Sequence, residues 1–418
     1  MTVIPSGLAL HPFRALRPAV TGERLASLLC PPYDVIDDAL RARLLAADPG
    51  NAVSVVLPRA DDGRDAYRDA AQRLRDWTQT GAYVLDEARA LYVYEMQDGT
   101  GSTRGLLGAV ELRDPSDGVI LPHEDTMAGP VADRLALMSA TEANVEPIYL
   151  VYDGGGSASD AVRDVDGSDP IAEATTPDAI THRLWAITDP AVQAAVAQDL
   201  QPRHALIADG HHRYATYRKL QQLLDAQHGP GAWDRGLTLL VDSSSYGPQV
   251  HAIHRVLVGI PLDRALEHAA GWADVVTVAD PRDALQHAAR LPGFAAVLTD
   301  GKRSVLLTDS AGRLADAARR PGEPDALTDL DVTVLHRALV QQVWQLSDSV
   351  EAVGYAHSLE QALVLAQQSR GTAVLLRATP VSAVAAVASV GARMPRKSTL
   401  FTPKPASGLV MRRFADES

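Results

Sequence analysis

The chain has 418 residues, of which 46% are hydrophobic and 22% charged, a composition typical of a globular protein with a sizeable core. Its net charge of −13 argues against generalised nucleic-acid binding, which needs a basic face. The single cysteine, Cys30, excludes an internal disulfide and a cysteine-based zinc site, and it fits a reducing cytoplasm.

Membrane and export signals are not predicted. No stretch of about 18 apolar residues suggests a membrane span, and the first twenty residues do not have the pattern of a secretory signal. We therefore expect a cytoplasmic protein without a membrane partner. The oligomeric state stays open, with a homodimer as one option.

Short strands and helices alternate in the N-terminal third. The Gly-, Ser- and Asp-rich stretch 154–170 is predicted to be a solvated loop, because its glycines do not have the spacing of a phosphate-binding loop. The residue patterns predict helices over 65–81 and 129–144, a hairpin turn over 97–103, and strands over 51–58, 90–96, 104–114 and 146–153.

From Pro261 onward, short helices and strands alternate in what we expect to be a small separate α/β unit. Two helices rich in Ala, Leu and Val are expected after it. Further strands are predicted over 182–189, 204–210, 236–244, 251–259 and 372–378. We expect an α+β fold, with mixed sheets surrounded by helices, divided into a core of residues 1–260, the small unit 261–327, and a segment 328–418 that packs back on the core.

The strand over 204–210 turns sharply into a helix at Asp209 and Gly210. Such a junction points free backbone N–H groups outward, and Gly210 lets the backbone come close to a ligand. His211, His212 and Arg213 then place positive charge at the helix N-terminus, where the dipole disfavours cations by about 0.3–1 kcal/mol. A bound phosphate, gripped by the fork of Arg213, would make this placement favourable.

Asp209 has two interpretations. At the end of the strand it could hold Mg²⁺ or accept a proton from a hydroxyl group. Alternatively, it is the N-cap of the helix, and the basic residues after it are solvated or paired with a carboxylate.

Three further residues are candidate catalytic groups. Prolines stiffen the segment 29–37 around Asp34, which suits a positioned general base, although a structural turn before a helix explains the pattern as well. His123 and Glu124 lie in a cluster of charged residues, and Glu124 is also a candidate Mg²⁺ ligand beside Asp209. The alternative for this cluster is ordinary charge pairing at the start of a helix.

The segment 391–399 nearly matches a P-loop. Arg396 stands where the second glycine is required, and a helix is expected before it, so we reject a P-loop here. Lys397, Ser398 and Lys404 still offer groups that could contact an anion. The alternative is a solvated basic loop.

Four motifs resemble, in order, the marks of an uncharacterised prokaryotic family, domain of unknown function 1015: CPPYDVI, LPHEDTM, IADGHHRYAT and MPRKSTLFTPK. That family is similar at its centre to the ParB/sulfiredoxin-like superfamily, in which a Gly-x-x-Arg turn at a helix start holds nucleotide phosphates. Gly210 and Arg213 match this turn. Sulfiredoxins need a cysteine at the place of His211, and ParB-type switches carry Glu and Arg where this chain has His211 and His212. No basic recognition helix for DNA is predicted either.

The free serine kinases of that superfamily transfer a phosphoryl group from an adenine nucleotide to a small hydroxyl, with a carboxylate as base. The resemblance therefore implies a nucleotide-dependent phosphotransferase acting on a small hydroxylated metabolite, a free amino acid being one candidate. The cofactors would be ATP or ADP, or else CTP, together with Mg²⁺. A non-catalytic nucleotide-binding regulator and a phosphate-ester hydrolase are the alternatives. The residues expected to contact the nucleotide are Gly210, His211, His212, Arg213, Lys397, Ser398 and Lys404.

Overall fold

The computed structural model describes residues 7–60, 65–347 and 349–417. They form two compact units. Unit 1 comprises the chain up to 122, residues 126–248 and the chain from 403 on, and unit 2 comprises residues 123–125 and 249–402. The boundaries expected at 260 and 327 do not coincide with this division, because strands on either side of them join one sheet of unit 2.

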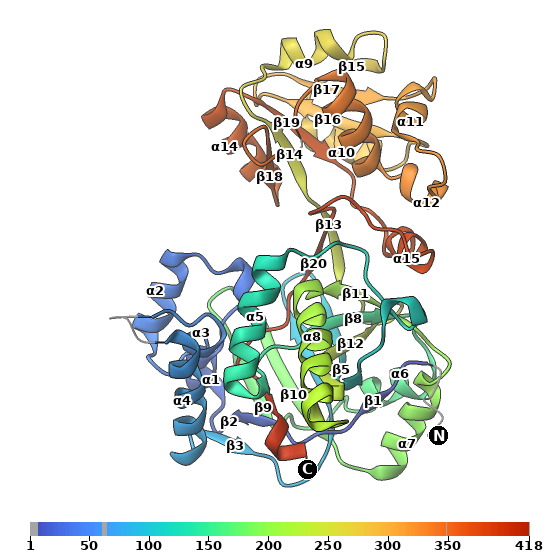
Figure 1. The fold of residues 1–418 in the computed structure, drawn as a ribbon. Helices are drawn as coiled ribbons and strands as arrows, with labels where there is room; N and C mark the ends of the chain where they lie inside the picture. The colour runs from blue at the N-terminus through green and yellow to red at the C-terminus, as the bar shows by residue number, and fades with distance from the viewer. Residues whose placement is uncertain (1–6, 61–64, 348, 418) are drawn as a thin grey trace. The chain divides into compact units, whose positions relative to one another are not determined.

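Unit 1 is built on a mixed nine-stranded sheet in the order β6-β11-β8-β12-β5-β4-β10-β9, with β1 paired to β5 (Figure 1). The β8–β12 and β6–β11 pairs are parallel, and the other neighbours are antiparallel. The strands are β1 (Leu10–His11), β4 (Leu91–Gln97), β5 (Ser102–Glu111), β6 (Ile120–Leu121), β8 (Ile148–Tyr152), β9 (Ala172–Thr175), β10 (Thr181–Ile187), β11 (Ala205–Asp209) and β12 (Arg235–Asp242). Two small ladders complete the unit: β2 (Leu16–Pro18) with β3 (Tyr83–Leu85), and β7 (Ala143–Asn144) with β21 (Arg412–Arg413).

Helices surround this sheet, as the α+β class requires. Side chains of α6, α7 and α8 share one core with the sheet, and a second core lies around α3 and α4. Helices α5 and α8 pack side by side (Figure 1). The helices of unit 1 are α1 (Gly22–Leu28), α2 (Asp38–Ala47), α3 (Val53–Val56), α4 (Ala66–Gln79), α5 (Ala128–Thr141), α6 (Gly156–Arg163), α7 (Pro190–Leu200) and α8 (His211–His228), with short helical turns η1 (Tyr33–Val35), η2 (Pro115–Asp117), η3 (Ala232–Asp234) and η5 (Phe414–Glu417).

Two predicted elements of unit 1 are wrong. The segment 51–58 is not a strand but contains helix α3, because the Asn51 side chain accepts the Val53 N–H and begins a helical turn. An apolar run this short does not distinguish a buried helix from a strand. The segment 154–170 is not only a loop, since Ala158, Ala161 and Val162 of α6 pack into the core. The predicted β4–β5 hairpin is confirmed.

Unit 2 is built on a six-stranded antiparallel sheet in the order β15-β17-β16-β19-β14-β18. Helices α10 and α14 share an alanine-rich core with this sheet. None of the described helices is both long and apolar enough to cross a membrane. The strands are β13 (Gln249–Ala252), β14 (His254–Leu257), β15 (Asp274–Val278), β16 (Ala295–Thr299), β17 (Ser304–Thr308), β18 (Val353–Ala356), β19 (Thr372–Leu376) and β20 (Thr399–Thr402), which pairs with β13. The helices are α9 (Leu262–Ala269), α10 (Pro281–Ala288), α11 (Arg313–Ala318), α12 (Asp325–Thr328), α13 (Asp331–Val334), η4 (Leu335–Val343), α14 (Leu359–Ser369) and α15 (Val381–Ser389).

The close packing of α8 on the sheet depends on Gly236 of β12. A methyl group there would overlap Cδ2 and Cε2 of the Tyr217 ring on α8. We expect Gly236→Ala to lower the free energy of unfolding by about 1–3 kcal/mol, measured by urea denaturation. The control is Gly99→Ala, where an added methyl group meets nothing within 4 Å. Equal losses in the two variants would contradict the packing argument.

Candidate functional site

The junction of β11 and α8 is the strand–turn–helix that the sequence predicts. Asp209 is the last residue of β11, and α8 begins at His211. Gly210 is the N-cap with φ of +94°, a left-handed conformation that glycine adopts without strain. The N-cap is therefore Gly210 and not Asp209, so the alternative interpretation of Asp209 as the N-cap is wrong.

Lys404 joins two of the predicted residues. Its ammonium Nζ lies 2.8 Å from Oδ2 of Asp34 and 2.7 Å from Oδ1 of Asp209. The Lys404 and Asp209 side chains are 15% and 16% exposed, whereas Asp34 is 41% exposed. The accessible carboxylate of the cluster is therefore Asp34.

Backbone pairing places these residues. Cys30 and Ser407 exchange two backbone hydrogen bonds, which set the segment before Asp34 beside the segment after Lys404. The Ala406 N–H donates to the buried hydroxyl of Tyr94 on β4 at 3.1 Å and fixes this segment to the sheet. The sheet thus determines where the ammonium of Lys404 lies.

Arg213 is directed into the protein. Its side chain is 4% exposed, and its guanidinium donates to Oδ2 of Asp209 and to the carbonyl oxygen of Pro147. Burial by itself lowers the pKa of Arg213, but the charges of Asp209 and Glu146 outweigh burial and raise it. Arg213 is consequently a fixed cation that holds one oxygen of Asp209, while Lys404 holds the other.

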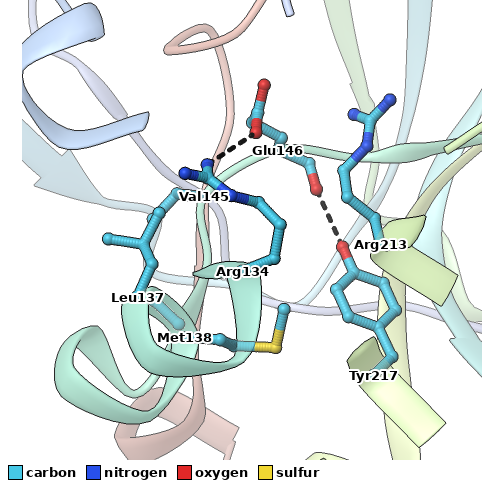
Figure 2. Close-up of a pocket in the computed structure, with 8 residues that line it drawn as sticks. Arg134, Leu137, Met138, Val145, Glu146, Arg213 and Tyr217 are labelled. Carbon is cyan, nitrogen blue, oxygen red and sulfur yellow. Dashed lines mark hydrogen bonds and ion pairs between the residues drawn. The ribbon is translucent and has the colours of Figure 1, made fainter. Parts of the chain in front are cut away.

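A second buried ion pair lies next to Arg213. Glu146 and Arg134 are 3% and 4% exposed and their charged groups are 3.9 Å apart. Glu146 also accepts from Ser407 Oγ at 2.8 Å and from the Tyr33 N–H at 3.1 Å. Figure 2 shows that Arg134, Glu146 and Arg213 line one pocket with Tyr217. The cavity has about 20 Å³, so it has room for a water molecule but not for a metabolite.

The charges of the Lys404 cluster are stable at neutral pH. Burial by itself raises the pKa of Asp34, but the charges of Lys404 and Arg213 outweigh it and lower this pKa. Burial lowers the pKa of Lys404, and the charges of Asp209 and Asp34 more than compensate and raise it. The lysine therefore keeps its proton and Asp34 stays ionised.

The two histidines after Gly210 are held by the protein. His211 is 8% exposed. Nε2 of His212 accepts a hydrogen bond from the Met127 N–H at 3.0 Å, which leaves the proton of a neutral ring on Nδ1. In this state His212 brings no positive charge to the start of α8.

The other four predicted residues belong to unit 2. His123 is fully buried and its Nε2 lies 3.1 Å from Oγ1 of Thr399, while Glu124 is the next residue of the chain. Ser398 Oγ donates to the Pro395 carbonyl oxygen, and Lys397 has a left-handed φ of +53°. These residues thus lie on two segments of unit 2, 123–125 and 394–399, whereas the Lys404 cluster consists of unit 1 residues.

The candidate site does not supply enough ligands among the described residues to hold a metal ion by protein groups alone. Within the described ranges, no group of three or more His, Cys, Asp or Glu residues is arranged to hold a metal ion. Both oxygens of Asp209 face cations, and an Mg²⁺ ion would compete with Lys404 and Arg213 for them. Any Mg²⁺ would therefore take most of its ligands from substrate phosphates and water.

Sequence analysis missed two residues of this region. Glu146 is a lone carboxylate before a fully apolar strand, and that position was a usable signal, since buried carboxylates are normally paired. Tyr149 pairs across the β8–β11 ladder with Asp209, and burial raises the pKa of its hydroxyl well above the usual value. Nothing in the local sequence distinguishes this tyrosine from an ordinary core residue.

The chain matches the family described as "Protein of unknown function (DUF1015)" over residues 10–333, and it belongs to that family. A search of curated proteins finds no match. Similar solved structures include a conserved hypothetical protein from Pyrococcus furiosus, with 14% identity, 72% of this chain and 94% of that chain covered, and a TM-score of 0.34. A free serine kinase in complex with AMP has 17% identity, coverage of 68% and 83%, and a TM-score of 0.34. SbnI with a C-terminal truncation, from Staphylococcus aureus, has 13% identity, coverage of 73% and 86%, and a TM-score of 0.37. Similarity at this level defines no role for a residue of this chain.

The lowered pKa of Asp34 has a consequence for stability. Because this pKa is lower in the folded chain than the unfolded value of about 3.9, the Asp34 ion pair stabilises the fold above about pH 4, and its contribution is lost as the pH falls through the folded-state pKa. We expect Asp34→Asn to lower the free energy of unfolding by about 1 kcal/mol or less at neutral pH, since Asp34 is partly exposed.

The difference between the wild type and Asp34→Asn should shrink as urea unfolding is repeated from about pH 6 down to about pH 2.5. Asp117, an exposed aspartate, provides the control Asp117→Asn, whose effect should not follow this pH dependence. A difference for Asp34→Asn that grows on acidification would contradict the assignment.

Proposed function

We propose that this protein is a nucleotide-dependent phosphotransferase that acts on a small hydroxylated metabolite, such as a free amino acid. The observation that carries the proposal is the ammonium of Lys404, held between Asp34 and Asp209 beside the uncapped start of α8. Phosphoryl transfer is catalysed mainly by positioning and charge stabilisation, which a lysine, carboxylates and oriented N–H groups supply.

The start of α8 would bind the phosphates. The first-turn N–H groups of a helix have no intrahelical acceptor, and the N-cap Gly210 makes no side-chain cap. Gly210 lacks a side chain that would shield them, and the helix dipole favours an anion at this position. We assign His211, His212 and Arg213 to this site through their backbone N–H groups.

Lys404 would contact the transferred phosphoryl group. The pairing of Ser407 with Cys30 fixes the backbone segment that carries Lys404. To bind a phosphate, the ammonium group needs only to exchange one carboxylate for a phosphate oxygen. The exchange is easiest at Asp34, because that side chain is the most exposed of the cluster. Arg213 keeps Asp209 in place while this happens.

Asp34, once released by Lys404, would act as the base. In the step, the acceptor hydroxyl oxygen forms a bond to the terminal phosphorus, the bond from phosphorus to the bridging oxygen breaks, and Asp34 takes the hydroxyl proton. Asp209 is less suited to this role, because two cations hold it. ATP or ADP is the proposed donor, CTP is a further one to test, and Mg²⁺ would enter with the phosphates.

A second candidate is a nucleotide-binding regulator without turnover. It is favoured by the lowered pKa of Asp34, which makes this carboxylate a weak base while Lys404 stays on it. The phosphate-ester hydrolase is a third outcome, in which water replaces the acceptor. Turnover and its products distinguish these functions.

The experiment is calorimetric titration of the full chain with ATP, ADP and CTP, with and without Mg²⁺, followed by mass spectrometry of metabolite mixtures incubated with each nucleotide. We expect Lys404→Met to weaken nucleotide binding at least tenfold, about 1.4 kcal/mol, because it removes the mobile cation. The control Lys219→Met removes an exposed lysine of helix α8 and should leave binding unchanged.

Asp34→Asn separates catalysis from binding. It should retain nucleotide binding and lose phosphoryl transfer, because the amide cannot take the proton. The variant Arg213→Ala should weaken nucleotide binding indirectly, because Asp209 loses the cation that holds it in place. Removal of one partner of a buried pair costs about 3–5 kcal/mol of stability, so the fold of this variant must be verified by circular dichroism. The phosphotransferase proposal fails if no nucleotide binds to the wild type, or if Asp34→Asn transfers phosphate as fast as the wild type.

A further inference from the structure

Unit 2 contains a pocket of about 880 Å³ that is lined only by residues of that unit. Its walls come from the start of β14, the segments that follow β18 and β19, helix α10, and the first turns of α14 and α15. This volume is typical of sites for small molecules. The pocket shares no residue with the Lys404 cluster.

His254 provides a donor in this pocket. It is 6% exposed, and its Nδ1 accepts the Leu376 N–H at 3.2 Å. Burial and the charge of Arg255 lower its pKa to about 4, so the ring is neutral at pH 7 and carries its proton on Nε2. Among the residues that the structure describes, none accepts a hydrogen bond from this Nε2–H.

Further hydrogen-bond donors, a hydroxyl and backbone N–H groups, lie where β19 leads into α15. Thr379 is 9% exposed, lines the pocket, and its hydroxyl has no hydrogen-bond partner within the described part of the chain. Helix α15 begins after Pro380, which offers no side-chain cap, so the first N–H groups of its nine residues remain available. His254 and Thr379 line the pocket, so their donors can bind an acceptor such as a carboxylate of a ligand in it.

The charges of the lining set the kind of ligand. Arg282 and Arg377 are the arginines of the lining, and Asp329, Asp331 and Glu360 are its carboxylates. Each carboxylate is paired with an arginine: Glu360 with Arg282, Asp331 with Arg377, and Asp329 with Arg319, which does not line the pocket. The side chains of Asp329 and Glu360 are exposed, so these two carboxylates can share an oxygen with the ammonium group of a ligand, whereas the donors near His254 favour a carboxylate.

The remaining wall is apolar. Leucine side chains from four separate segments line the pocket: Leu285, Leu330, Leu359 and Leu376. An aliphatic or aromatic group packed on this wall stabilises the complex by about 25 cal/mol for each Å² of apolar surface removed from water.

We propose that this pocket of unit 2 binds an apolar α-amino acid. The carboxylate lies at the His254 Nε2–H, the Thr379 hydroxyl and the first turn of α15. The ammonium group contacts the acidic residues, and the side chain packs on the leucines. This site is independent of the proposed phosphotransferase function, because no residue of the Lys404 cluster takes part.

The test is calorimetric titration of the full chain with leucine, valine, isoleucine, methionine and phenylalanine. We expect at least one of them to bind, and His254→Asn to weaken that binding at least tenfold. The asparagine oxygen can still accept the Leu376 N–H, whereas the Nε2–H donor is lost. The matched control His268→Asn changes an exposed histidine of α9 and should leave the affinity unchanged.

A second variant tests the location without touching a hydrogen bond. Ala383→Trp, on the side of α15 that lines the pocket, should abolish binding by filling it. Lys404→Met should bind the amino acid with the affinity of the wild type, because Lys404 does not line this pocket. The amino-acid titration therefore tests the pocket of unit 2 even if the nucleotide proposal is wrong. The proposal is overturned if none of the five amino acids binds up to about 10 mM, or if binding persists in both His254→Asn and Ala383→Trp.

Discussion

The contact of the Lys404 ammonium with two carboxylates is the constraint on which the candidate site of unit 1 depends. It joins segments around residues 34, 209 and 404, which are far apart in the sequence. Taking a charge out of water costs several kcal/mol, and the cost is offset only where the geometry supplies opposite charges at short range. The sheet, through the pairing of Cys30 with Ser407 and the Tyr94 hydroxyl, brings the lysine to that place.

The charged groups of this region form a series from the interior to the surface. The innermost pair, Arg134 and Glu146, is 3–4% exposed, Arg213 connects it with Asp209, and the series ends at Asp34, which is 41% exposed. Every inner group has a fixed partner, and a change of partner there would leave a buried charge uncompensated. Only the contact of Lys404 with Asp34 can open without that penalty, which is why the proposed function places the ligand at this end.

The sequence predicted local features of this site better than its contacts. The turn at Gly210 follows from an apolar strand that meets a glycine and a helical pattern, all within a few residues. The sequence did not predict the partners of Lys404, because these lie hundreds of residues away along the chain and their contact depends on the pairing of Cys30 with Ser407. Helix α3 was mistaken for a strand because its four residues are all buried, which removes the periodicity that distinguishes the two structures. The family match covers residues 10–333, so Lys404 was singled out only by the motif MPRKSTLFTPK, which did not predict its partners.

The positive charge at the start of α8 has a different explanation from the one that the sequence favoured. A cation in the first turn opposes the helix dipole, but Asp209 neutralises the guanidinium of Arg213, and His212 is neutral because it accepts the Met127 N–H. The cation that lies against Asp209 from outside the helix is Lys404, whose side chain is 15% exposed. In the proposed function, α8 offers an anion the backbone N–H groups of its first turn, and their use depends on Lys404 leaving Asp34. On that proposal a phosphate and a carboxylate compete for one ammonium group, and this competition would decide what the site does.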